Sequence, residues 1–125
     1  MTYLEAEKKL VLFLAGVLDL SPDRDIFAGT LPEGVQEGIT AELVSGEPAA
    51  LNNTNIFTAR ICGRSLSRKK SRQYAHALVS VLPVFGKAGL LSVRVKEEVP
   101  LKFAEDRSTG ACLHTFSLDL CVSFV

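Results

Sequence analysis

Two residues with reactive side chains, Cys112 and His114, are separated by a single residue. If this segment is a strand, both side chains point to the same face. A thiol beside an imidazole could be a nucleophile with its base, or two ligands of a metal ion. A metal site needs more ligands at a recognisable spacing, and only His76 and Cys62 remain as candidates. The sequence therefore favours a structural thiol beside a hydrogen-bonded histidine, and it assigns no catalytic residue, metal ligand or cofactor.

Motifs of the common enzyme and nucleotide-binding classes are absent from the sequence. It contains no GxGxxG, no glycine-rich loop ending in Gly-Lys-Ser/Thr, no HExxH and no GxSxG. We therefore expect a protein that is not an enzyme. The three cysteines, an odd number with no CxxC spacing, predict buried free thiols in a reducing compartment.

The N-terminus resembles a secretory leader only in part. Lys8 and Lys9 precede an apolar run at 10–18, but Glu5 and Glu7 lie in the segment that a leader would keep basic, and no small-x-small cleavage site follows. The run is also shorter than the ~20 residues that span a bilayer. We expect neither a secretory leader nor a membrane segment.

Basic residues are concentrated in one part of the chain. Residues 51–96 contain nine bases and no acid, residues 1–50 contain three bases and nine acids, and residues 97–125 contain two bases and five acids. The balances of +9, −6 and −3 sum to the net charge of zero. The candidate residues for assembly or anion contact are the bases of the densest part: Arg60, Arg64, Arg68, Lys69, Lys70 and Arg72.

Most of these bases fall at the start of a predicted helix, where the helix dipole disfavours cations. Local stability therefore does not explain them. Three alternatives stay open: a solvated face whose charges pair with the acids of the first half after folding, a head-to-tail contact between the basic part of one copy and the acidic part of the next, or contact with nucleic acid.

The spacing of apolar residues predicts the elements that carry these side chains. A helix is expected at 2–18, with a capping box formed by Thr2 and Glu5, and a second helix is expected from Ser65 or Ser67 to about 82. Strands are expected at 25–28, 39–44, 55–62, 91–95 and 115–124, with turns at 45–48 and 107–110. The last strand has the strongest alternation, since Phe116 and every second residue after it are apolar.

The length of 125 residues predicts a single domain, 1–125. The order of elements, α-β-β-β-α-β-β with short turns, indicates an α+β fold: two layers, with a mostly antiparallel sheet of four to five strands and two helices packed on one face. The other face of the sheet has mixed polar residues. We expect it to be solvated or to meet another subunit.

This order, together with several short segments, resembles the small minor capsid and tail-terminator proteins of long-tailed bacteriophages. The segments are Ile26-Phe27-Ala28-Gly29, Leu31-Pro32-Glu33, 39–44, Phe57-Thr58-Ala59-Arg60-Ile61, Tyr74-Ala75-His76-Ala77-Leu78 and Phe116-Ser117-Leu118-Asp119-Leu120. The resemblance covers almost the whole chain and implies a structural role without cofactor or active site. Such proteins form a ring, commonly a hexamer, that caps the tail tube and joins it to the head connector. The resemblance also implies that the protein is part of the virion and assembles in the host cytoplasm.

A second resemblance concerns residues 63–78, which are similar to the second helix of double-stranded RNA-binding domains. There the basic start of the helix contacts phosphates across a groove. The chain departs from that family because it lacks the Gly-Pro-x-His-type loop, its first helix is too apolar to contact RNA, and two strands follow the helix. RNA binding is therefore the alternative function, and the head–tail neck role is preferred.

Overall fold

The computed structural model describes residues 3–50, 54–87, 90–96, 101–107 and 110–124. Over these residues the chain forms two helices and seven strands: α1 (Tyr3–Leu18), β1 (Ile26–Ala28), β2 (Gly38–Ala50), β3 (Thr54–Ser65), α2 (Arg68–Val81), β4 (Val84–Lys87), β5 (Leu90–Val95), β6 (Lys102–Asp106) and β7 (Leu113–Phe124). Thr2, half of the expected capping box, lies outside the described residues. Neither described helix is long and apolar enough to cross a membrane.

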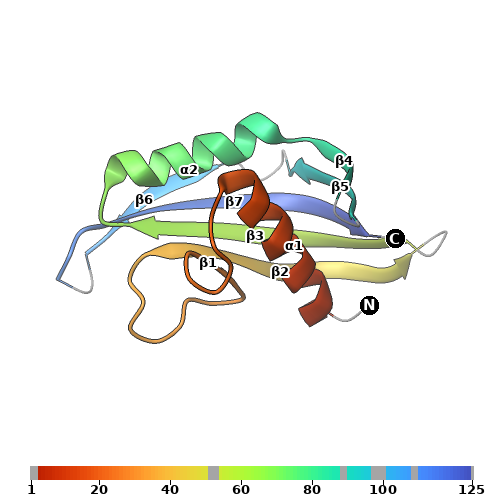
Figure 1. Cartoon of the computed structure of the whole chain (residues 1–125), viewed down its shortest axis with the longest axis horizontal. Coiled ribbons are helices and arrows are strands. Elements are labelled where there is room, and N and C mark those ends of the chain that lie inside the picture. Colours follow the sequence, from red (N-terminus) through yellow and green to blue (C-terminus); the bar gives the residue numbers. More distant parts are fainter. Residues whose placement is uncertain (1–2, 51–53, 88–89, 97–100, 108–109, 125) are drawn as a thin grey trace.

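The strands form one sheet in the order β1-β2-β3-β7-β5-β4, and β6 pairs with β7 beside this path. The β1–β2 pair is parallel and all other pairs are antiparallel. Both helices lie on the same face of the sheet, with α1 next to β1 and β2 and α2 next to β3 and β7 (Figure 1). The predicted two-layer α+β fold is therefore confirmed.

The core lies between the helices and the covered face of the sheet. From β7 it receives the alternating residues that the sequence predicted, all of them buried: Phe116, Leu118, Leu120, Val122 and Phe124. Leu10 and Leu14 of α1 and Leu78 of α2 are fully buried against this layer. The free thiols Cys62, Cys112 and Cys121 are partly buried, so they are more accessible than expected.

Within the described residues the sheet has more strands than the four to five expected from the sequence. The two additional strands are β4 and β6. β4 is four residues long and contains Gly86, and β6 is exposed along most of its length. An exposed strand needs no apolar alternation, so it leaves no period-two pattern to recognise.

The turn expected at 45–48 is wrong, because β2 continues through these residues to Ala50. The pairing of β2 with β3 shifts register between Leu43 and Ser45 and then resumes. Gly46 lies opposite Phe57, and a Cβ at Gly46 would overlap the Phe57 ring. The glycine therefore makes room for an aromatic ring of the neighbouring strand, a use of glycine that a turn signal in the sequence does not distinguish.

The second helix begins where the sequence predicted. The Ser67 side chain caps it by accepting a hydrogen bond from the Lys70 backbone N–H at 3.2 Å. Its buried face consists of Ser71, Ala75 and Leu78. Val81, the last residue of the helix, is exposed.

Candidate functional site

The face of the sheet that no described helix covers is polar. In β3 it carries Thr58, Arg60 and Cys62, and these residues lie opposite Cys121, Asp119 and Ser117 of β7. The strand period of two puts these six residues on one side, away from the core. The expectation of a mixed polar face is therefore met, with charged groups near its centre.

The central charges of this face are paired within the chain. Arg60 Nε donates to Asp119 Oδ1 at 3.0 Å and Arg60 Nη2 donates to Oδ2 at 3.3 Å. Asp119 is only 3% exposed, whereas the Arg60 side chain is about half exposed. The hydrogen bond to Asp119, and then the charge of Asp119, raise the pKa of Arg60 above its ordinary value.

Arg64 is paired in the same way. Its Nη2 lies 2.7 Å from Asp106 Oδ2. Two of the six candidate bases therefore have acidic partners, but these acids come from the C-terminal part of the chain and not from the first half. Glu7 and Glu37 of the first half instead accept hydrogen bonds from the backbone N–H groups of Leu43 and Leu66.

The other four candidate bases lie on the first turns of α2, and all four are exposed: Arg68, Lys69, Lys70 and Arg72. Within the described residues none of them forms an ion pair with an acid. Lys70 Nζ lies 5.7 Å from the centroid of the Tyr74 ring, and the Arg72 guanidinium lies 4.2 Å from the centroid of Phe103. These ring contacts orient the two cations without neutralising them.

Hollows flank this basic turn of helix on two sides. One, of about 330 Å³, lies between α2 and the β6–β7 pair and is lined by Arg68, Arg72, Phe103 and His114, among others. Another, of about 160 Å³, places Lys70 across from Asp25 and Glu37 without an ion pair. Arg64 lines the second hollow together with Lys70, so only Arg60 is set apart, near the centre of the uncovered sheet face.

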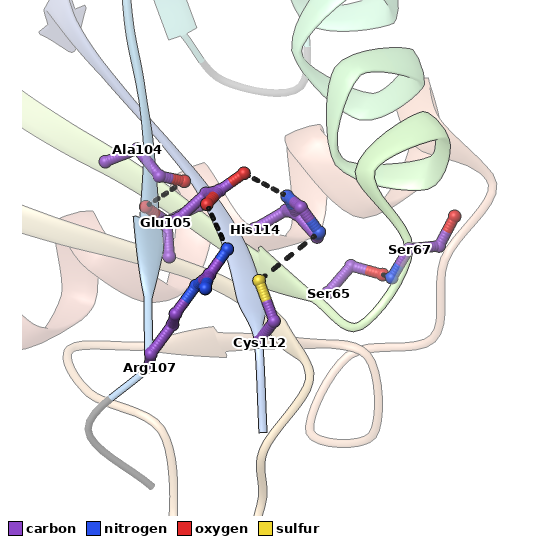
Figure 2. Close-up of polar contacts among 8 residues, drawn as sticks. Ser65, Ser67, Ala104, Glu105, Arg107, Cys112 and His114 are labelled. Atoms are coloured by element: carbon purple, nitrogen blue, oxygen red, sulfur yellow. Dashed lines mark hydrogen bonds and ion pairs between the residues drawn. The ribbon is translucent and has the colours of Figure 1, made fainter. Parts of the chain in front are cut away.

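A polar cluster lies at the end of β6 and the start of β7. It is formed by Glu105, Arg107, Cys112 and His114 (Figure 2). Glu105 is directly opposite His114 in the strand register. The Cys112 sulfur lies 3.7 Å from His114 Nε2, which confirms that the two side chains share a face. On the other side of the ring, His114 Nδ1 lies 3.8 Å from Glu105 Oε1.

Arg107 completes the cluster with a positive charge. Its Nη2 lies 3.2 Å from Glu105 Oε2. The electrostatic interaction with Cys112, and then the hydrogen bond to Glu105, raise the pKa of Arg107 above its ordinary value. The Gly110 backbone N–H donates to the Arg107 carbonyl at 3.2 Å, in agreement with the turn predicted at 107–110, of which Ser108 and Thr109 lie outside the described residues.

The order Cys112, His114, Glu105 matches a nucleophile, its base and an orienting carboxylate. However, the Cys112 thiol is not among the residues that line the adjacent hollow. The same three side chains offer sulfur, nitrogen and oxygen ligands for a metal. Sequence reasoning missed Glu105, because its strand has no apolar alternation and the residue was not placed next to His114.

No family model and no curated protein matches the chain. Among solved structures, a chain of the "Virion of native gene transfer agent (GTA) particle" is similar to it, with 11% sequence identity and a TM-score of 0.46. The similarity covers 99% of this chain and 98% of that chain. At this TM-score and identity the similarity does not establish a shared function.

Proposed function

We propose that this chain is a structural subunit of a phage-type virion that acts at the head–tail neck. In this role it is a tail-terminator or minor capsid protein that forms a ring, of six copies in the common case, caps the tail tube and contacts the head connector. It assembles in the host cytoplasm and does no catalysis. The resemblance of the sequence to that family suggests the role, and the charge distribution on the folded chain supports it.

The observation that carries the proposal is the unpaired basic turn of α2. Arg60 and Arg64 are paired with acids of the same chain, whereas Arg68 and Lys69 are exposed and have no acidic partner among the described residues. Cations at a helix N-terminus oppose the helix dipole, so they do not stabilise the helix that carries them. An anionic surface outside the chain gives them a partner.

A second copy of the chain offers such a surface. Asp19, Asp23 and Glu33 are exposed in the loops that follow α1 and β1. Contact between the basic turn of one copy and these loops of the next joins two different patches, and contacts of this kind close into rings when the rotation between copies allows it. Complementary charge sets the register of such a contact.

Exposed apolar side chains add a second reason to expect partners. Leu4 and Leu12 of α1 are 56% and 62% exposed. α1 is apolar nearly all round from its second turn, and the sheet covers only part of it. A helix of this kind is stabilised further when a neighbouring subunit covers the remaining leucines.

The test compares the protein with a charge-reversed variant, Arg68→Glu/Lys69→Glu/Lys70→Glu, by light scattering at low and high salt. We expect the unchanged chain to form a discrete oligomer and the variant to be monomeric with an unaltered circular-dichroism spectrum. The control is Arg94→Glu/Lys102→Glu, which reverses exposed bases of β5 and β6, outside α1, α2 and the acidic loops, and should still assemble.

Two results would contradict the proposal. One is a strict monomer at high protein concentration in both salts. The other is salt-dependent binding of duplex RNA by a monomer, lost in the α2 variant, because that behaviour belongs to the alternative function of an RNA-binding module. An α2 variant that loses its circular-dichroism signal would show that these bases stabilise the fold instead.

A further inference from the structure

We propose that Glu105, Cys112 and His114 bind one divalent transition-metal ion, with Zn²⁺ as the best match. The three residues come from two adjacent strands and one turn, and Figure 2 shows their side chains converging on one face of the hairpin. Each offers one ligand atom, and these atoms all lie within 4.8 Å of one another. This site does not depend on the proposed role in a virion.

The spacing of the thiol and the imidazole fits a zinc ion. In a tetrahedral site with Zn–S near 2.3 Å and Zn–N near 2.0–2.1 Å, the two ligand atoms are about 3.6 Å apart. Cys112 Sγ and His114 Nε2 are 3.7 Å apart. An ion can therefore be held between them without a change in either strand.

Glu105 supplies the third ligand. It lies directly opposite His114, and its side chain is 48% exposed, so the carboxylate has room to turn toward the ion. In this structure the carboxylate lies 3.8 Å from Nδ1, so it must turn toward the Nε2 side of the ring to reach an ion held by Cys112 and His114. With three protein ligands, the fourth position of a tetrahedral zinc site is taken by water.

The chemistry of the ligands selects the metal. A thiolate with an imidazole suits Zn²⁺ and related transition metals, whereas Ca²⁺ and Mg²⁺ prefer oxygen ligands alone. The Glu105 carboxylate carries one negative charge, and Arg107 at 3.2 Å from Glu105 contributes one positive charge.

The experiment titrates the reduced, chelator-treated protein with Co²⁺, which takes the place of Zn²⁺ and makes the site visible. A cysteine ligand gives a thiolate-to-cobalt charge-transfer absorption in the near ultraviolet. We expect this absorption to saturate at one equivalent and to disappear when Zn²⁺ is added. Zn²⁺ should also raise the melting temperature, since it binds the folded chain.

Variants assign the ligands. Cys112→Ala should abolish the absorption, and Glu105→Gln and His114→Ala should each weaken Co²⁺ binding by more than about 10-fold. The matched controls Cys121→Ala and His76→Ala change the same residue types outside the cluster and should bind Co²⁺ as the unchanged chain does. Circular dichroism confirms that each variant is folded.

Three results would overturn the site. The first is no saturable cobalt absorption at millimolar Co²⁺ by the folded, reduced protein. The second is an absorption that survives Cys112→Ala and is lost in Cys121→Ala. The third is a Glu105→Gln variant with unchanged affinity, which would remove Glu105 from the set of ligands.

Discussion

At the scale of single residues, Asp119 is the feature that the sequence conceals. It occupies a polar position in the alternation of β7, which predicts an exposed side chain, yet it is 3% exposed and held by Arg60. The alternation correctly gives the face on which a residue lies. It does not reveal that neighbouring side chains bury one position of that face, because this depends on which residue lies opposite in another strand.

The Arg60–Asp119 ion pair should contribute to the stability of the fold. Arg60→Ala should lower the free energy of unfolding by about 2 kcal/mol, because it leaves a buried carboxylate without its partner. Arg94→Ala, which removes an exposed base from a strand of the same sheet, should change it by less than about 0.5 kcal/mol. Urea denaturation of the two variants checks this, and equal effects would show that the pairing contributes nothing.

The pH dependence of this pair follows from the raised pKa of Arg60. A base whose folded-state pKa is raised stabilises the fold below its unfolded pKa, and that contribution is lost only as the pH rises through the folded value. Since the ordinary pKa of arginine is already strongly basic, the Arg60 charge persists across the neutral and moderately alkaline range. Mild alkali therefore leaves the contribution of Arg60 unchanged.

At the scale of elements, the helices were predicted more accurately than the sheet. α1 and α2 end within two residues of their expected limits, because capping residues and apolar spacing are local signals. β2 and β3 are longer than expected, and β4 and β6 were missed. Strand limits depend on pairing between distant segments, which local patterns do not contain.

Substitution of two glycines by alanine should change the stability of the fold in opposite directions. Gly63→Ala should destabilise the fold by about 1–3 kcal/mol, because a Cβ there would overlap the buried ring of Phe116. Gly16→Ala should stabilise it by about 0.5–1 kcal/mol, because Gly16 is exposed inside α1 with open space around its Cα. Thermal melts of the two variants test both, and a stable Gly63→Ala variant would mean that Phe116 moves aside easily.

At the scale of the whole molecule, folding separates bases that are close together in the sequence and brings Glu105 next to His114. Arg60 follows the period of a strand to the uncovered face, while Arg68 and Arg72 follow a helix to the other side. The charge run could be found from sequence, but its division between two surfaces could not. The convergence of Glu105 on His114 is equally a product of strand register, so the metal cluster was beyond the reach of spacing rules.

The neighbours of β7 determine which strands can detach from the sheet locally. On one side β3 pairs along nearly its whole length, from Ser65–His114 to Asn55–Phe124. On the other side β6 covers 113–117 and β5 covers 120–124. The contacts of β6 are thus independent of those of β5, and either strand can detach while β3 keeps β7 in place.

In hydrogen–deuterium exchange, amides of β6 should exchange much faster than those of β3, and Zn²⁺ should slow the β6 amides selectively.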